Sequence, residues 1–327
     1  MKKITLIIPY FGIFPAYYQL FLDSCAHNEE IDWLIFTDNQ QEYRYPPNVH
    51  TVFWTFEELK NYIGSKFDFS ISLNEPYKLC DYKPAYGYIF EDYLKESDYW
   101  GYCDLDLIFG DIKKFINEEC FEIYDKIGHL GHLTLYRNTQ DINILFMQAN
   151  IQKIFGNSQI FVFDEWGLEN INSLFIKNGK KVLFWNSFLD VYPYDDNFKR
   201  IITKIERDNE IKISIYRNKL PFIAAYYSGK VFQEGILLKK SKEFAYIHLQ
   251  KRRMRVDFEL SGNIRDEYVI IPERFCSRKK CSLIKVLIQE SIHFFFNKKR
   301  IMHGYLVCKY WIIEKTGFIR HKIKRLR

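Results

Sequence analysis

The chain has 327 residues, of which 47 are Lys or Arg and 41 are Asp or Glu, so its formal net charge is +6. A composition of 47% hydrophobic and 27% charged residues is that of a globular protein and excludes disorder or a fibrous repeat for most of the chain. The charge is unevenly placed, because residues 274–327 carry 15 Lys and Arg against two acids, a net charge of +13 that leaves −7 on the remainder.

The seven cysteines are odd in number, scattered along the chain and never spaced C-x-x-C. This pattern argues against a disulfide framework or a zinc site and suits a reducing cytoplasm. The apolar N-terminal run could imitate a signal peptide, but Pro9 and Pro15 interrupt it, so we expect a first buried strand. No run approaches the ~18 apolar residues that a membrane-spanning helix needs.

The first hundred residues alternate apolar strands with helical segments. A β-branched run at 4–10 predicts a strand, and Pro15 stands where a helix can begin. Thr55, with Glu58 three residues later, forms a capping box that opens a helix over 55–63. This alternation predicts an α/β domain with a largely parallel sheet, whose ligand lies beyond the carboxyl ends of the strands. Further strands are expected at 31–39, 49–54 and 99–112, and a further helix over 83–95.

The second half of the chain continues the pattern up to a change of composition near 252–275. We expect strands at 131–138, 180–187, 211–218 and 244–251, a helix over 165–177, and a hairpin over 224–235 that turns at Ser228 and Gly229. The sequence therefore predicts one α/β domain at 1–255 with a mostly parallel central sheet, and a C-terminal extension at 256–327.

Two acids follow the predicted strand in the segment GYCDLDLIFGD. Asp104 and Asp106 are two residues apart, so in extended chain their carboxylates point to the same side, with backbones roughly 7 Å apart. Neighbouring carboxylates repel each other unless they share a cation, and oxygen ligands favour Mg²⁺ or Mn²⁺ over zinc. Asp-x-Asp is common at protein surfaces, but here an apolar aromatic strand precedes it and Leu105 and Leu107 flank its second acid, which favours a metal site.

At this segment the sequence resembles the nucleotide-sugar glycosyltransferases of the GT-A fold, whose signature is a hydrophobic strand that ends in Asp-x-Asp. DYWGYCDLDLIFGDI, preceded by KPAYGYIFEDYL, is similar to bacterial polysaccharide glycosyltransferases of the capsule and O-antigen type. More distantly it resembles retaining galactosyltransferase and glycogenin-like enzymes, over about residues 1–255. The resemblance implies a GT-A fold, a contact of Asp104 with the ribose and the metal, and binding by Asp106 of the metal that bridges the diphosphate.

The resemblance also implies contacts with the nucleotide. Pro9, Tyr10 and Phe11, at the end of the first strand, match the place where the family holds the base and ribose. Thr37 and Asp38, after the second strand, match another nucleotide-contacting loop. A plain role in turns is the alternative for both segments.

Three basic residues are implied to act on the metal or the diphosphate. His248, near the end of a late strand, looks like the third metal ligand of the retaining enzymes, and Lys251 looks like their diphosphate lysine. Lys83 precedes Pro84 at an expected helix start, which the resemblance puts beside the donor sugar or diphosphate. The alternatives are a structural role for His248, a solvated position at the start of the basic tail for Lys251, and an ordinary surface position for Lys83.

Asp164 and Glu165 form a second acidic spot, in FVFDEWG. An N-cap and a first-turn acid would explain them without chemistry. The resemblance implies instead that one of them is catalytic, and we favour Asp164 for sugar hydroxyls with Glu165 as the alternative base.

Two other pairs of titratable residues are expected to be structural. His129 and His132 should diverge on a strand or turn, so we expect satisfied or acceptor-side histidines rather than a metal pair. Asp195 and Asp196 fit a turn.

The basic tail mixes apolar clusters with Lys and Arg over 281–297 and 301–315. Such amphipathic helices lie in the headgroup region of anionic membranes, where each basic residue contributes on the order of 1 kcal/mol. Packing of the apolar side onto the domain is an alternative. Binding to nucleic acid is not expected, because the α/β part shows no zinc spacing, nucleic-acid sheet signature or basic-aromatic platform.

Together these features predict a metal-dependent glycosyltransferase that moves a hexosyl unit from a nucleoside diphosphate sugar, expected to be a UDP-hexose, onto a lipid-linked surface glycan. The cofactor would be Mn²⁺ or Mg²⁺, retention of configuration is expected, and the enzyme would act in the cytoplasm at the inner face of the cell membrane. The alternatives are a catalytically silent membrane-peripheral scaffold of the same fold and a metal-dependent phosphotransfer or nucleotidyltransferase enzyme.

Overall fold

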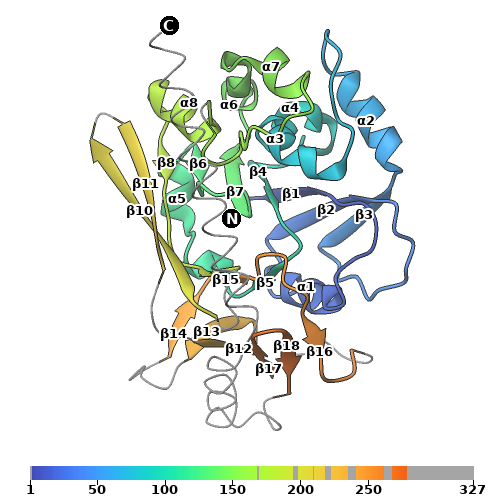
Figure 1. Cartoon of the computed structure of the whole chain (residues 1–327), viewed down its shortest axis with the longest axis vertical. Coiled ribbons are helices and arrows are strands. Elements are labelled where there is room, and N and C mark those ends of the chain that lie inside the picture. The colour runs from blue at the N-terminus through green and yellow to red at the C-terminus, as the bar shows by residue number, and fades with distance from the viewer. Residues whose placement is uncertain are drawn as a thin grey trace, which may run out of the picture.

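The computed structural model describes residues 2–167, 169–193, 198–208, 210–217, 222–234, 241–260 and 267–277. Within these residues the strands form three sheets, of seven, five and six strands. Helices α3 (Leu79–Tyr82), α4 (Tyr86–Ile89), α6 (Gln140–Asn143) and α7 (Ile151–Phe155) gather on the upper side of the first sheet in Figure 1, and the third sheet lies at the bottom of that view. No helix of the described part of the chain is long and apolar enough to cross a bilayer.

The first sheet has the strand order β3-β2-β1-β4-β7-β6-β8. The ladders from β3 to β4 are parallel, those of β7 with β4 and β6 are antiparallel, and that of β6 with β8 is parallel. The strands are β3 (Val49–Phe53), β2 (Ile31–Thr37), β1 (Ile4–Pro9), β4 (Tyr99–Cys103), β7 (Leu133–Arg137), β6 (Lys126–Ile127) and β8 (Val182–Leu183).

The second and third sheets lie beside the first and carry most of the antiparallel pairing. The second sheet consists of β11 (Glu210–Arg217), β10 (Arg200–Asp208), β9 (Leu189–Val191), β15 (Tyr246–His248) and β5 (Leu107–Phe109). The third consists of β14 (Lys242–Phe244), β13 (Lys230–Glu234), β12 (Ile223–Tyr227), β17 (Glu267–Ile271), β18 (Arg274–Cys276) and β16 (Arg255–Val256).

The fold class is mixed α/β, and the expectation of a mostly parallel central sheet is wrong. Parallel pairing from β3 to β4 agrees with the strand and helix alternation in the first hundred residues. From β7 onward most ladders are antiparallel. The first of them joins β7 to β4, because the chain returns beside β4 after the acidic loop. A strand that is buried on both faces reads as an apolar run in either kind of ladder, so the sequence does not distinguish them.

The third sheet crosses the expected domain boundary at residue 255. Strand β17 pairs with β12, and β18 pairs with both β17 and β16. The expected hairpin is present, with Tyr227 paired to Lys230 across Ser228 and Gly229. The described chain as far as β18 therefore belongs to the same set of sheets as the residues before 255.

The helices are short, and two expected ones differ from the sequence interpretation. The capping box of Thr55 and Glu58 opens α2, as predicted. The helix expected over 83–95 is a series of single turns, and the helix expected over 165–177 begins only at Ile171. The α-helices are α1 (Tyr18–Cys25), α2 (Phe56–Gly64), α3 (Leu79–Tyr82), α4 (Tyr86–Ile89), α5 (Glu118–Ile123), α6 (Gln140–Asn143), α7 (Ile151–Phe155) and α8 (Ile171–Lys177). The 3-10 turns are η1 (Pro76–Lys78), η2 (Lys83–Ala85), η3 (Glu91–Tyr93), η4 (Ile112–Lys114) and η5 (Leu145–Gln148).

Both faces of the first sheet are covered by apolar side chains. Leu6 and Ile8 pack on the face that α1 covers, whereas Ile7 between them packs on the face that α2, α3 and α4 cover. This alternation is the period-2 pattern of a strand buried on both sides. Every residue of α1 is buried, and Leu20 of this helix and Tyr17 just before it pack against residues of the second and third sheets. The carboxyl ends of β1 and β4 are left at the edge where the site lies.

Candidate functional site

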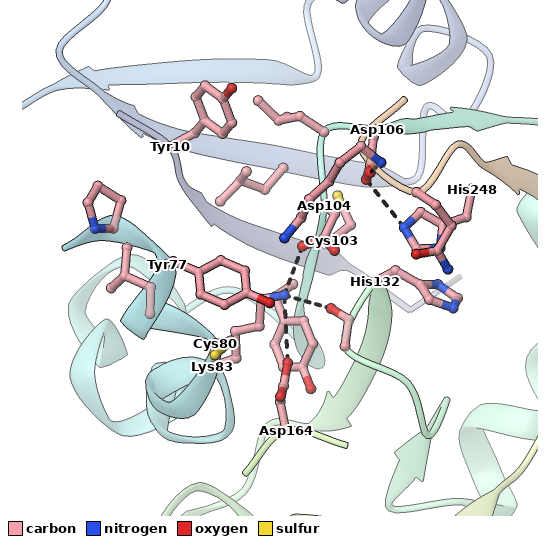
Figure 2. A pocket seen from close by; sticks show the side chains of 18 of the residues that line it. Tyr10, Tyr77, Cys80, Lys83, Cys103, Asp104, Asp106, His132, Asp164 and His248 are labelled. Carbon is pink, nitrogen blue, oxygen red and sulfur yellow. Dashed lines mark hydrogen bonds and ion pairs between the residues drawn. The ribbon is translucent and has the colours of Figure 1, made fainter. Parts of the chain in front are cut away.

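A cavity of about 1030 Å³ opens beyond the carboxyl ends of β1 and β4. Segments that are far apart in the sequence line it, and Figure 2 shows their polar side chains converging on one region. These segments are the loop after β1, the turns η1 to α4, the acidic loop after β4, residues 130–132, the loop 160–166, and residues 248–254 after β15. The cavity therefore lies where the sequence analysis predicted a ligand, beyond the carboxyl ends of the strands.

The acidic loop begins where β4 ends. Leu105 is buried in the core that α1 covers, so Asp104 and Asp106 on either side of it project toward the cavity. The backbone holds this geometry, because the N–H of Asp104 donates to the carbonyl of His132 and the N–H of Leu249 donates to the carbonyl of Asp106. Both acids line the cavity, as the spacing predicted.

His248 reaches the acidic loop through the register of the second sheet. It pairs with Leu107 of β5 on one side and with Asp190 of β9 on the other. Its Nε2 lies 3.4 Å from Asp106 Oδ1, and its Nδ1 lies 2.9 Å from Asp190 Oδ1. Gln250 Nε2 also donates to Asp190 Oδ1, at 2.6 Å. Asp190 therefore fixes the His248 ring from the side opposite Asp106.

The residues Asp104, Asp106 and His248 fit a divalent cation. One ligand atom from each lies within 4.8 Å of the others. Asp106 Oδ1 is buried, makes no hydrogen bond among the described residues and lies 3.4 Å from His248 Nε2, so these two atoms face each other where a cation would be held. In the metal-free protein burial would raise the pKa of Asp106, but the neighbouring His248 outweighs burial and holds the pKa well below its usual range. Carboxylate oxygens with one imidazole form a donor set of the kind that holds divalent cations.

Lys83 is placed inside the site rather than on the surface. Its Nζ donates to Asp104 Oδ1 and to the Gly131 carbonyl, both at 2.8 Å, and lies 3.7 Å from Asp164 Oδ2. Figure 2 shows it between these two acids. Burial would lower the pKa of Lys83, but Asp104 and Asp164 outweigh burial and raise it, so the ammonium stays charged.

The loop that carries Asp164 and Glu165 is held by hydrogen bonds and not by a helix. The backbone N–H groups of Phe161 and Phe163 donate to the buried carboxylate of Asp81. Helix α8 begins at Ile171 with Asn170 as its N-cap, so the interpretation of Asp164 and Glu165 as a cap and a first-turn acid is wrong.

Both acids of this loop line the cavity and lie against Gly131. A Cβ at Gly131 would lie 2.3 Å from Asp164 Oδ2 and 2.9 Å from Glu165 Oε1, so both carboxylates need a glycine there. The N–H of Gly131 donates to Glu165 Oε1. Burial raises the pKa of Asp164 to about 8, with Lys83 opposing, and burial also raises the pKa of Glu165.

The raised pKa of Asp164 predicts a pH-dependent cost to stability. The folded protein keeps a proton on this carboxyl between about pH 4 and pH 8, whereas the unfolded chain releases it, so the free energy of unfolding falls as the pH rises through this window. In EDTA we expect Asp164→Asn to exceed the wild type by at least about 1 kcal/mol at pH 8, and the difference to vanish toward pH 4. Urea unfolding of the wild type and of Asp164→Asn at each pH measures the two free energies of unfolding. The control Asp68→Asn alters an exposed aspartate and should show no such trend; a pH-independent difference for Asp164→Asn would contradict the prediction.

Lys251 lies at the rim of the cavity. Gln250 and Lys251 both adopt positive φ, at 53° and 56°, which turns the chain sharply after β15. The N–H of Lys251 donates to Asp106 Oδ2, and its Nζ lies 4.1 Å from the centre of the Tyr77 ring. Arg252 and Arg253 also line the cavity, so the turn brings positive charge to its rim.

The two segments expected to contact a nucleotide are placed differently. Pro9, Tyr10 and Phe11 line the cavity. Thr37 and Asp38 are not among the residues that line it, because Thr37 is fully buried and Asp38 Oδ1 accepts from the N–H of Gly12, at 2.8 Å. This second loop therefore supports the loop after β1 through a hydrogen bond, in agreement with the alternative of a plain role in turns.

The two histidines of the segment 129–132 diverge, as expected, but neither is fully satisfied, because both ring nitrogens of His129 and Nε2 of His132 are buried without a hydrogen-bond partner among the described residues. His129 lies away from the cavity, whereas His132 lines it beside His248, with ring centres 4.4 Å apart. The Tyr246 hydroxyl is 3.1 Å from His132 Nδ1, and Nε2 is buried without a hydrogen-bond partner among the described residues. Burial, with His248 adding, lowers the pKa of His132 to about 3.

The sequence analysis named His132 only as a satisfied or acceptor-side histidine. It missed Asp190, which lines the cavity, and Asp81, which holds the loop of Asp164. An acid inside the apolar run SFLDVYP is the signal that could have marked Asp190. Two of the expected features lie outside the described residues: the turn at Asp195 and Asp196, and the amphipathic segments over 281–297 and 301–315.

Comparison with known proteins gives a family but no activity. A search among curated proteins found no match. Residues 6–279, which contain every residue of the site, match the model described as "Family of unknown function (DUF6625)". The chain belongs to this family, DUF6625.

Proposed function

We propose that this protein is a metal-dependent glycosyltransferase of GT-A fold, which moves a hexosyl unit from a nucleoside diphosphate sugar, a UDP-hexose, to a glycan acceptor. One observation carries the proposal. Asp104 and Asp106, directly after β4, converge with His248 from a strand about 140 residues later, within 4.8 Å and at the edge of a cavity large enough for a nucleotide sugar. The parallel order β3-β2-β1-β4 and the acidic loop after its last strand support the fold assignment.

The charges around the cavity suit a diphosphate leaving group. When bound at Asp104, Asp106 and His248, a divalent cation supplies Lewis-acid stabilisation of a diphosphate. Lys251 and the two arginines after it add positive charge at the rim, where the negative charge develops in the transition state. Tyr10 also lines the cavity, and we propose that its ring packs against the base.

The reaction breaks the bond between the anomeric carbon and the diphosphate oxygen, whose electron pair stays with the diphosphate. The oxygen of an acceptor hydroxyl forms the new bond to carbon and gives up its proton. Asp164 is protonated below about pH 8, so it can donate a hydrogen bond to a sugar oxygen. Glu165, with a raised pKa and one oxygen held by Gly131, is the candidate acceptor of the proton. We propose retention of configuration, which NMR of the first-formed product tests.

Diphosphate release tests the proposal. The full chain is incubated with a panel of nucleotide sugars and Mn²⁺, with and without EDTA, and free nucleoside diphosphate is measured. At least one donor should be consumed, and EDTA should abolish its consumption. A panel in which no donor is bound or hydrolysed would remove the enzyme proposal and leave a silent protein of this fold.

We further propose that the acceptor is lipid-linked and that the protein meets it at the inner membrane face. The positive charge of residues 278–327 supports this location. Because β18 ends at Cys276, the chain can be cut after residue 277 without removing a described strand. We expect the truncated protein to lose at least about tenfold in affinity for vesicles containing anionic lipid, since each basic residue near such a surface contributes on the order of 1 kcal/mol. Vesicle sedimentation at two salt concentrations measures this, and vesicles of neutral lipid are the control. Equal binding by both chains would place membrane contact elsewhere.

A further inference from the structure

The ammonium of Lys251 is left without an acceptor by the described protein. Two lysines, Lys83 and Lys251, are among the described residues that line the cavity. The ammonium of Lys83 donates to Asp104 and to the Gly131 carbonyl. Lys251 Nζ forms no hydrogen bond or ion pair with any described residue, and it lies 4.1 Å from the centre of the Tyr77 ring. The N–H donors of Lys251 are therefore available to an anionic ligand.

The turn after β15 holds the backbone of Lys251 beside the acidic loop. Gln250 and Lys251 both have positive φ, a conformation that costs free energy in residues other than glycine and persists only where the surroundings impose it. The side chain of Gln250 donates to Asp190. The N–H of Lys251 donates to Asp106 Oδ2. These two hydrogen bonds hold the strained turn and fix the point from which the Lys251 side chain starts.

Tyr77 faces Lys251 from a turn that is anchored in the core. It lies in η1, which begins with Pro76 at its first position. The next residue, Lys78, is 1% exposed, and its ammonium is bound by Asp81 and by two backbone carbonyls. Tyr77 itself is 57% exposed, and Figure 2 shows its ring among the side chains that line the cavity. The ring therefore has a fixed place in the cavity and remains accessible.

The contact between Tyr77 and Lys251 orders a flexible cation without neutralising it. The face of an aromatic ring attracts an ammonium group through its quadrupole and carries no opposite charge. A lysine side chain that is free in water loses much rotamer freedom when it binds an anion. Holding it in place before the ligand arrives lowers this entropic cost and so raises the affinity for the anion.

We propose that Tyr77 is a positioning residue that holds the Lys251 ammonium for the second phosphate of a nucleoside diphosphate, so that the cavity prefers diphosphates to monophosphates. The inference rests on the proposed function for the identity of this ligand. The backbone of Lys251 is bonded to Asp106, one of the proposed metal ligands. An anion on a cation held there is therefore within reach of the Lys251 side chain.

Calorimetric titration of UDP and of UMP into the full chain with Mn²⁺ tests the inference. Tyr77→Leu removes the ring and should weaken UDP binding by at least about threefold, with a smaller effect on UMP. Tyr77→Phe keeps the ring and should bind both nucleotides within about twofold of the wild type. The control Tyr227→Leu alters a similarly exposed tyrosine that does not line the cavity, and it should change neither affinity.

A double-mutant cycle with Lys251→Met separates positioning from direct contact with the ligand. If Tyr77 acts through Lys251, Tyr77→Leu should cause no further loss of UDP affinity in the Lys251→Met background. An equal loss in both backgrounds would show that Tyr77 contacts the nucleotide itself and would overturn the inference. Thermal melting of each variant shows that it is folded.

The outcomes distinguish this inference from the proposed function. An unchanged UDP affinity in Tyr77→Leu would overturn the inference even if a nucleotide sugar is consumed. A preference for UDP over UMP that is reduced both in Tyr77→Leu and in Lys251→Met supports it even if no nucleotide sugar is consumed. If the wild type does not bind UDP, or binds it no more tightly than UMP, the inference is overturned, while consumption of a nucleotide sugar still decides the proposed function.

Discussion

Asp106→Asn should abolish metal-dependent turnover, with a loss of at least about 100-fold in diphosphate release and a matching loss of Mn²⁺ binding. The substitution keeps the size of the side chain but removes its charge. One oxygen of Asp106 is buried beside His248 without a hydrogen bond, and the other accepts from the N–H of Lys251. An amide can present an oxygen at only one of these positions, so its NH₂ group faces either the cation or a backbone donor.

Asp111→Asn is the matched control, since it makes the same chemical change in the same segment. Asp111 caps the turn η4 by accepting from the N–H of Lys114, and Asn caps a helical turn about as well as Asp does. This control should retain turnover and Mn²⁺ binding within about twofold of the wild type. If Asp106→Asn kept turnover as well, the assignment of the acidic loop to a cation would fail.

The acidic loop was predictable because its information is local. An apolar strand that ends in Asp-x-Asp places both carboxylates by the alternation of an extended chain, and the structure puts both in the cavity. The family resemblance, and not a local pattern, pointed to His248. Its convergence with Asp104 and Asp106 depends on the pairing of β15 with β5, which no local pattern specifies. Asp190 was missed for the same reason, since its role comes from the register of β9 against β15.

The sheet direction and the second acidic spot show where local patterns stop being sufficient. The apolar run of β7 fits a parallel or an antiparallel neighbour equally well, and only the path of the chain makes it antiparallel. Asp164 and Asn170 are both acceptable N-cap residues, so the start of α8 is ambiguous in the sequence. The choice falls on Asn170 because Asp81, about 80 residues earlier, binds the backbone of Phe161 and Phe163 and keeps this stretch out of a helix.

Lys78→Met should destabilise the protein by about 3–5 kcal/mol, because it removes one partner of a buried ion pair. Lys78 and Asp81 are 1% and 0% exposed, and their side-chain atoms are 2.7 Å apart. Lys78 also donates to the carbonyls of Ile154 and Gln159, at 2.8 Å and 2.5 Å. Methionine preserves most of the volume, so the loss is electrostatic and not a cavity. Urea unfolding measures the change, and Lys60→Met is the control, since the Lys60 and Glu57 pair is exposed and contributes at most about 1 kcal/mol.

The double variant Lys78→Met with Asp81→Asn separates an unpaired charge from a general loss of packing. Asparagine can still accept from the N–H groups of Phe161 and Phe163 through one oxygen, and it carries no charge that needs Lys78. The double variant should therefore be more stable than Lys78→Met alone, a sign that loss of packing would not produce. Because these bonds hold the loop of Asp164, Lys78→Met should also lower kcat more than it raises KM for the donor. If the double variant were less stable than Lys78→Met, the unpaired charge of Asp81 would not be the cause of the instability. The loop of Asp164 would then be held by its own packing.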